Sequence, residues 1–439
     1  MKFCSVRKFY SFILLATLTA LLSMTAACGS GGSVDTSYEN NPPAYSWWNG
    51  YYSSESSLIQ PETLAAWIDN GFKTADGSPV VVFDVMTDYA SAVAPKIAGS
   101  VAKGAISSFG YNDNRAEGPL DTTGYNSGAG HGASSAMMIT GSRIDAIVQD
   151  LGITEKTVLV LTGTGSGAQY DVWRTYWIFT YWGFSKAKIK VLDGGTAAFA
   201  AAFPALAPTT VTALYDPADS TFSVKKLPVL KSQVRASIKE VIDAVENGSP
   251  VIFAQATAAG SRNIKTEHSF FLGAGSVHVN GKFNDADTIK ATIIANINAS
   301  YAADSNPATV TTWDDVLALF AGKTIYVHCG AGFSASALYT AFVDVLGIPV
   351  VLYDGSNNQW NAFKADGPLQ GLIPAYDTSL YSFSVNGGQT ALVGAPGVFV
   401  DWNYTGTGNE IYEEDYEYHN ATPAGNGGGG LGDSIGSGC

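Results

Sequence analysis

The sequence predicts an α/β fold of two domains, each a mainly parallel central sheet flanked by helices. Runs of β-branched and aromatic residues alternate with segments of helical spacing, which is typical of parallel strands joined by crossover helices. The order strand, glycine-rich loop, helix, strand and Asp-Gly occurs at 157–195 and again at 324–355, which indicates an internal repeat. The length of 439 residues is enough for two or three domains that each bury a core.

The first repeat begins with an apolar run at 79–85, which predicts a buried strand ending near Asp84. Further strands are expected at 157–161 and 189–192, with Asp193-Gly194-Gly195 directly after the second of them. The glycine-rich loop 163–167 lies between these strands and opens into a predicted helix at 170–182. This helix is rich in Trp, Tyr and Phe, so most of it is expected in the core, whereas Arg174 could instead face the second domain.

The second repeat contains the same kinds of element in a similar order, after a Pro, Ala and Thr-rich stretch that indicates a linker at 204–218. Helices are expected at 232–245, 313–320 and 337–346. Strands are expected at 250–254, 324–328 and 348–353.

Cys329 lies where the strand 324–328 meets its glycine-rich loop. Backbone N–H groups that converge at a helix N-terminus, together with the positive end of the helix dipole, stabilise a thiolate at such a turn. Glycines at 330 and 332 let the loop curl closely around whatever the sulfur carries. His328 precedes the cysteine on the strand and should point away from it, so a packing role is expected for the imidazole.

This part of the chain resembles the active-site half of a rhodanese (sulfurtransferase) domain. The resemblance rests on Val327-His328-Cys329-Gly-Ala-Gly-Phe-Ser-Ala-Ser336, Leu346-Gly347, Val351-Leu352-Tyr353-Asp354-Gly355-Ser356 and Trp360. It implies that the Cys329 thiolate takes a sulfane sulfur from thiosulfate or 3-mercaptopyruvate, holds it as a persulfide and passes it to a thiol or cyanide, with no cofactor. The loop that would cradle the persulfide comprises Gly330, Ala331, Gly332, Phe333, Ser334 and Ala335.

The first repeat resembles the inactive copy that tandem sulfurtransferases commonly keep. Thr162 stands where the second repeat has Cys329, and a hydroxyl cannot replace a thiolate in sulfur transfer, so the first domain is expected to be catalytically silent. Residues 99–106 resemble the Gly-His-Ile-Pro-Gly-Ala-Ile stretch of the family, with Ser100 in place of His. Residues 275–281 occupy that place imperfectly in the second repeat.

The loop after Cys329 contains no charge and looks more like that of mercaptopyruvate-using members, with Ser334 supplying a hydroxyl. An anionic donor still requires a cation, for which Arg262, Lys265 and Lys282 are the candidates, although each could be a solvated surface charge. Cysteine phosphatases need an Arg at the end of the loop, and residues 334–336 are Ser, Ala and Ser, so phosphatase activity is not expected.

The N-terminus has the pattern of a secretory signal: basic residues, an apolar run at 12–22 and small residues before Cys28. It resembles a bacterial lipoprotein signal, which implies lipidation of Cys28 and attachment to a membrane of the cell envelope, at the periplasmic or outer-membrane face. Thr25 is atypical and leaves ordinary cleavage open. The expected organisation is a signal peptide (1–27), a tether (28–54), an N-terminal domain (55–205), a linker (206–228), a C-terminal domain (229–404) and an acidic, then glycine-rich flexible tail (405–439).

The formal net charge of −14 argues against nucleic acid as a partner. The five histidines are scattered, and no Cys/His spacing fits a metal site. A non-catalytic alternative remains, in which the chain is a rhodanese-like binding or assembly module of an envelope redox system and Cys329 is vestigial. A further alternative uses Cys439 as a resolving thiol for the Cys329 persulfide.

Overall fold

The structure is a computed structural model, which describes part of the chain. The described residues are 56–85, 95–101, 115, 117, 137–164, 168–209, 218–246, 249–254, 264, 266, 268–303, 308–362, 381–383, 389–391 and 406–421. Cys28, Arg262, Lys265 and Cys439 lie outside them, so the expectations for these four residues stay predictions.

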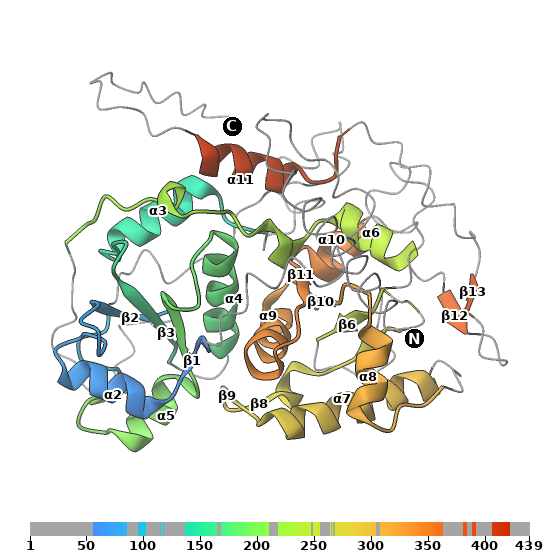
Figure 1. Ribbon diagram of the computed structural model, residues 1–439, viewed down its shortest axis with the longest axis horizontal. Helices are drawn as coiled ribbons and strands as arrows, with labels where there is room; N and C mark the ends of the chain where they lie inside the picture. Colours follow the sequence, from blue (N-terminus) through green and yellow to red (C-terminus); the bar gives the residue numbers. More distant parts are fainter. Residues whose placement is uncertain are drawn as a thin grey trace, which may run out of the picture. The chain divides into compact units, whose positions relative to one another are not determined.

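The first half of the described chain, 56–209, forms a four-stranded parallel sheet (Figure 1). In spatial order its strands are β1 (Leu58–Ile59), β4 (Ile189–Leu192), β3 (Val158–Thr162) and β2 (Val80–Asp84). Its helices are α2 (Pro61–Asp69), α3 (Gly141–Asp150), α4 (Ala168–Tyr181) and α5 (Gly195–Ala202). Strands β2 and β3 are buried along their whole length, as expected for parallel strands covered on both faces.

The second half, 218–362, forms a five-stranded parallel sheet. Its strands are, in spatial order, β5 (Arg235–Ala236), β11 (Val351–Tyr353), β10 (Tyr326–His328), β6 (Val251–Phe253) and β7 (Phe270–Phe271). Its helices are α6 (Ile238–Glu246), α7 (Ala286–Ala303), α8 (Trp313–Phe320), α9 (Phe333–Thr340) and α10 (Ser356–Ala362). The predicted α/β fold class, two parallel sheets flanked by helices, is confirmed.

None of the helices in the described residues is long and apolar enough to cross a bilayer. Several smaller elements complete the described part of the chain. Short 3-10 helices are η4 (Val224–Lys226), η5 (Ser232–Val234) and η7 (Ala274–Ser276), and η8 (Ala341–Leu346) is a π-helical continuation of α9. Antiparallel pairs are β8 (His278–Val279) with β9 (Lys282–Phe283), and β12 (Tyr381–Phe383) with β13 (Gln389–Ala391). Near the C-terminus lies α11 (Glu410–Asn420), whose Ile411, Asp415 and His419 are buried.

The prediction of one helix over 232–245 was wrong. Arg235 and Ala236 pair in parallel with Leu352 and Tyr353 of β11, so an edge strand separates η5 from α6. The apolar spacing fits a helix throughout, but the sheet edge binds the backbone at these two residues. Tertiary pairing therefore overrides the local pattern.

The two sheets share their strand order, and their registers show which residues correspond. Leu161 pairs with Val191, three residues before Gly194, and Val327 pairs with Leu352, three residues before Gly355. Thr162 therefore corresponds to His328, and Gly163 corresponds to Cys329. The prediction that Thr162 takes the cysteine position was wrong by one residue, because the sequence places the end of the first-half strand at Leu161, whereas β3 continues through Thr162.

The edge strands correct a second correspondence. Val101 pairs in parallel with Phe83 at the edge of the first sheet, and Phe270 pairs in the same way with Ile252 in the second. The second-half counterpart of Gly99 to Val101 is thus 268–270, and not the segment 275–281 that the sequence suggested. That segment contributes to η7, β8 and the turn before β9.

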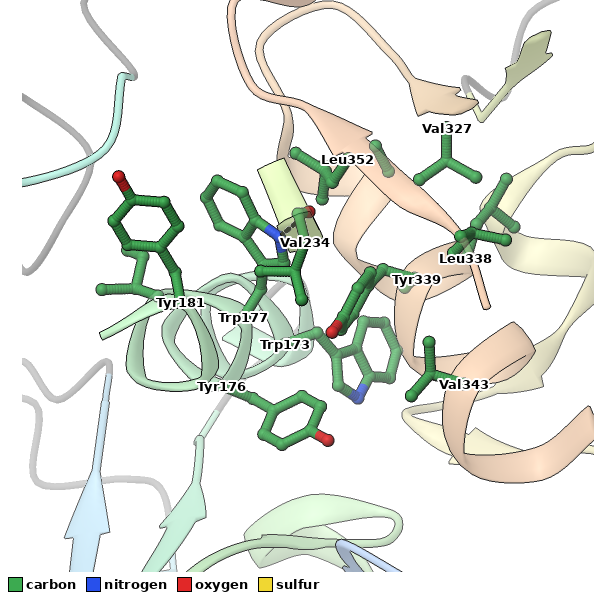
Figure 2. Close-up of a cluster of buried hydrophobic side chains, with 14 of the residues drawn as sticks. Trp173, Tyr176, Trp177, Tyr181, Val234, Val327, Leu338, Tyr339, Val343 and Leu352 are labelled. Carbon is green, nitrogen blue, oxygen red and sulfur yellow. Dashed lines mark hydrogen bonds between the residues drawn. The ribbon is translucent and has the colours of Figure 1, made fainter. Parts of the chain in front are cut away.

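The helices α4 and α9 pack against each other between the two sheets, and a single apolar core continues through this contact (Figures 1 and 2). Trp173, Tyr176 and Trp177 come from α4, and Leu338 and Tyr339 come from α9. The Trp177 indole donates a hydrogen bond to the Val234 carbonyl oxygen at 2.9 Å. Because α4 lies between the first sheet and α9, nearly all its side chains are buried, which confirms the core position predicted from its aromatic content.

Candidate active site

Cys329 directly follows β10, and its side chain is almost completely enclosed, with 3% of the residue exposed. The Gly332 backbone N–H donates to Cys329 Sγ at 3.1 Å. Gly332 has a φ of 84° and caps the N-terminus of α9. This left-handed conformation, which glycine adopts without strain, turns the loop back toward the sulfur and places the positive end of a helix beside it.

Helix α10 fixes the other side of the loop. The N–H groups of Asn357 and Asn358 donate to the carbonyl oxygens of Cys329 and Gly330, both at 3.0 Å. In a trans peptide the N–H of the next residue points opposite to the carbonyl, so the N–H groups of Gly330 and Ala331 point away from α10. The loop therefore turns its acceptors toward a helix N-terminus and its donors away from it, which leaves those donors for an anion.

The predicted loop residues form one continuous turn around the sulfur. Gly330, Ala331, Phe333 and Ser334 are half-buried, and Gly332 and Ala335 are buried. The Cys329 N–H donates to Ser356 Oγ at 3.2 Å, and this hydroxyl donates to the Tyr353 carbonyl oxygen at 2.7 Å. Through Ser356, the stretch Asp354-Gly355-Ser356 thus fixes the start of the cysteine loop to the end of β11.

Arg174 reaches this loop from the first half of the chain. Its side chain is fully buried, and the guanidinium lies 4.4 Å over the Trp177 ring. A Cβ atom placed on Gly332 would lie 2.5 Å from Arg174 Nη1, so the guanidinium occupies the space that a larger residue in the loop would need. Of the two alternatives that the sequence leaves open for Arg174, facing the second half is the one the structure shows.

A row of buried charges continues behind Arg174. Asp354 lies 3.9 Å from Arg174 Nη2 and 3.1 Å from Arg235 Nη2, and it accepts the N–H of Met138 at 2.8 Å. Glu117 accepts two hydrogen bonds from Arg235, at 2.9 and 3.0 Å. Burial raises the pKa of Glu117, against the opposing effect of Arg235. For Arg235, burial works against the charge, but the carboxylates of Asp354 and Glu117 hold its pKa well above the ordinary value.

Aromatic side chains of both halves meet beside the loop. Tyr170 and Trp173 of α4 contact the His278 ring, with centroids 5.7 and 4.6 Å apart. Burial raises the pKa of Tyr170, and the negative charge of a Cys329 thiolate raises it further. Burial lowers the pKa of His278 to about 4, so this imidazole is neutral at pH 7.

His328 points into the core, as the alternation along a strand predicts. It is fully buried, and its ring centroid lies 5.0 Å from that of Phe253. Burial lowers the pKa of His328 to about 3. An enclosed imidazole with so low a pKa is too weak a base to take a proton from a thiol, and its ring packs on Phe253, so the packing interpretation is confirmed.

The His328 burial predicts a loss of stability in mild acid. An unfolded histidine has a pKa of about 6.5, so between pH 6.5 and 3 the unfolded chain binds the extra proton, and stability present above pH 6.5 is lost as the pH falls. From pH 7 to pH 5 this residue should lower the free energy of unfolding by about 2 kcal/mol. Urea unfolding of wild type and His328→Phe at both values checks it, and equal pH dependence in the two proteins would contradict it.

The corresponding turn of the first half has no room for a reactive side chain. A Cβ on Gly163 would lie 2.9 Å from Val172 Cγ2 and 3.0 Å from Ala168 Cβ, so the first turn of α4 fills the place that Cys329 occupies in the second half. Thr162 Oγ1 instead pairs with Thr196 Oγ1 at 2.9 Å. Asp84 accepts the Thr164 hydroxyl at 2.7 Å, which ties the end of β2 to this turn.

Gly163→Ala should therefore lower the free energy of unfolding by about 1–3 kcal/mol, because the added methyl group overpacks the turn. Gly275→Ala is the matched control, since a Cβ there would meet nothing within 4 Å, and it should change stability by less than about 0.5 kcal/mol. Chemical denaturation of the three proteins measures both effects. Equal stability of the two variants would mean that the turn has space after all.

The sequence predicts the cysteine loop but not Arg235 and Glu117, two of the buried charges beside it. Arg262 and Lys265, the predicted cations, lie outside the described residues, and Lys282 is exposed on β9. Arg235 and Glu117 gave no recognisable signal, since their meeting depends on the packing of the two halves. Arg174 did give one, as the basic residue on a helix rich in aromatic side chains. Among the described residues, no group of three or more His, Cys, Asp or Glu could hold a metal ion.

Comparison with known proteins gives similarity at the level of the fold. No protein-family model and no curated protein matches the sequence. The structure is similar to the Tum1 protein of Saccharomyces cerevisiae, at 17% identity and a TM-score of 0.47, over 71% of this chain and 96% of that one. It is also similar to the 3-mercaptopyruvate sulfotransferase SseA of Escherichia coli, described with the rhodanese fold, at 17% identity and a TM-score of 0.45, over 69% of this chain and 98% of that one. A third similar structure is that of EanB, at 14% identity and a TM-score of 0.48, over 71% of this chain and 68% of that one.

Proposed function

We propose that this protein is a sulfurtransferase that carries a sulfane sulfur as a persulfide on Cys329. The observation that carries the proposal is the hydrogen bond from the Gly332 N–H to Cys329 Sγ, in a loop whose other donors point away from α10. Such donors stabilise a sulfur anion and need no rearrangement during the reaction. The sequence resemblance to rhodanese active sites supports the same chemistry.

The proposed reaction has two displacement steps. The Cys329 thiolate attacks the outer sulfur of the donor, a new S–S bond forms, and the old bond of that sulfur breaks with its electron pair leaving on the donor. Thiosulfate releases sulfite in this way. 3-Mercaptopyruvate releases the enolate of pyruvate, which takes the proton of the transferred thiol. An acceptor thiolate or cyanide then attacks the outer sulfur of the persulfide and regenerates the Cys329 thiolate.

The donor is proposed to be a small anion of the thiosulfate or 3-mercaptopyruvate type. Loop residues Gly330 to Ala335 are uncharged, and Ser334 is half-buried. Mercaptopyruvate, which carries one negative charge, requires fewer cations than thiosulfate, which carries two. We therefore expect faster sulfur uptake from 3-mercaptopyruvate than from thiosulfate.

Intact mass spectrometry of the purified protein after incubation with each donor tests the proposal. The expected result is a gain of one sulfur, located on the Cys329 peptide and discharged by cyanide as thiocyanate. The initial rates of uptake rank the two donors. If Cys329 alkylates readily but gains no sulfur from either donor, the protein is not a sulfurtransferase for these donors, and a binding or assembly role becomes the better description.

We also propose that the protein is exported and anchored to a bacterial membrane by lipid on Cys28, as its N-terminal sequence suggests. Labelling of growing cells with a fatty acid that carries a chemical tag should mark the wild-type protein and leave Cys28→Ser unmarked. The same variant should move from the membrane to the aqueous fraction. A wild-type protein that takes up no label would contradict the anchor.

A further inference from the structure

We infer that Arg174, from the half of the chain without the reactive cysteine, is the positioning residue that supplies positive charge to the Cys329 site and makes it selective for anionic reagents. The inference rests on the proposed function where it concerns sulfur donors, and on the structure alone where it concerns charge at the sulfur. The half of the chain without the reactive cysteine would thus contribute a charged residue to the Cys329 site.

The contact with the loop is direct. The Gly332 N–H donates to the sulfur, and Arg174 Nη1 lies 2.5 Å from the place that a Cβ of Gly332 would take. The guanidinium therefore packs against the same glycine that donates to the sulfur. Tyr170 lies one helical turn earlier on the same face of α4, and its carbonyl oxygen accepts a hydrogen bond from Ser336 Oγ of α9 at 3.4 Å. One face of α4 thus forms part of the site's wall.

The orientation of the guanidinium is fixed from two sides. The centre of the guanidinium lies 4.4 Å from the Trp177 ring centroid, and Arg174 Nη2 lies 3.9 Å from an Asp354 carboxylate oxygen. Since Asp354 also binds Arg235, which binds Glu117, the contacts run in the order Gly332, Arg174, Asp354, Arg235 and Glu117. The charges alternate along this row, and the positive end is the one that meets the loop.

Burial makes this charge effective. Arg174 is fully enclosed, so water and salt screen its field much less than the field of an exposed lysine. The cysteine loop carries no cation of its own. An anion that approaches the sulfur is therefore attracted by a charge that already points at the loop before the anion arrives, which is the arrangement that lowers the reorganisation cost of a reaction.

The test compares alkylation of Cys329 by iodoacetate, which is an anion, with alkylation by iodoacetamide, which is neutral and of nearly the same size. The ratio of the two rate constants, measured on the Cys329 peptide by mass spectrometry, reports charge at the sulfur and cancels changes in accessibility or thiolate content. Variants of the full chain are Arg174→Gln, Arg174→Lys and, as the matched control, Arg115→Gln. Arg115 is also buried, but it binds Asp415 and Glu414 of α11.

Arg174→Gln is expected to lower the iodoacetate to iodoacetamide ratio about tenfold, whereas Arg174→Lys keeps most of it and Arg115→Gln leaves it unchanged. An unchanged ratio in a folded Arg174→Gln protein would overturn the inference. If the variants do not fold, the wild-type protein alone still tests the inference. Its iodoacetate to iodoacetamide ratio must exceed that of N-acetylcysteine amide in the same buffer, and an equal or lower ratio overturns the inference.

This readout separates the two proposals. Alkylation needs no sulfur donor, so an Arg174-dependent ratio in a protein that takes up no sulfur would support the charge at the site and contradict the sulfurtransferase. Sulfur uptake with an Arg174-independent ratio would do the reverse. If both hold, Arg174→Gln should slow uptake from thiosulfate more than uptake from 3-mercaptopyruvate, since thiosulfate carries the larger charge.

Discussion

Cys329→Ser is expected to abolish sulfur uptake from both donors, with a loss of at least about 1,000-fold in rate. The serine hydroxyl can accept the Gly332 N–H as the sulfur does, so the loop should keep its shape. The loss would then be chemical, because a hydroxyl stays protonated at neutral pH and does not attack a sulfane sulfur. Thiocyanate formation from cyanide and each donor gives the rate.

Two further variants complete this test. Ser334→Ala leaves the nucleophile in place and should reduce the rate by less than tenfold, since it removes one hydroxyl at the loop surface. Cys439→Ser should leave turnover unchanged if Cys329 works alone, and a fall in turnover would support the resolving-thiol alternative. Residual activity in Cys329→Ser above one hundredth of wild type would place the nucleophile on another residue.

Asp354→Ala is expected to lower the free energy of unfolding by about 3–5 kcal/mol, the largest change in stability that the site predicts. The carboxylate binds Arg235 and lies between it and Arg174, and it also accepts the backbone N–H groups of Met138 and Gly355. Its removal takes a buried carboxylate away from both arginines, whereas Glu117 still binds Arg235. Urea unfolding of the full chain measures the effect.

Asp354→Asn separates the charge from the hydrogen bonds, because the amide oxygen can still accept a backbone N–H. Its stability should lie between those of wild type and Asp354→Ala. Asp243→Ala serves as the surface control, since Asp243 pairs with Lys239 one helical turn away and is partly exposed, and it should cost less than about 0.5 kcal/mol. A loss below 1 kcal/mol in Asp354→Ala would show that the buried ion pairs contribute little.

The sequence predicts the fold class and the cysteine loop because both have local signals. Strands are predicted directly from the apolar runs of β2, β3 and β10, and a turn is predicted from the glycines at 330 and 332. The edge strands β5 and β7 have only two residues each, so neither periodicity nor propensity reveals them. They exist because a longer strand beside them offers backbone partners, and that partner is distant in sequence.

The correspondence between the halves shows the same limit. Matching the motifs by sequence assigns Thr162 to Cys329, whereas the sheet register assigns Gly163, because β3 extends one residue beyond the predicted strand end at Leu161. The cations are the other case. Arg174 is conspicuous on its aromatic helix, but its partner Asp354 is not, because Asp354 lies more than 100 residues away from both Arg174 and Arg235 and a single sequence carries no pattern for such a meeting.

Helix α11 has a consequence for the order in which the protein can complete its fold. Its Asp415 binds Arg115, 300 residues earlier, and its Tyr418 donates to Asp145, 273 residues earlier. A chain synthesised from its N-terminus therefore makes α3 and the Arg115 segment long before their partners emerge, and closing so long a loop is slow. Until α11 arrives, Arg115 lacks Asp415 and Glu414, so the first half finishes packing only when almost the whole polypeptide has been made.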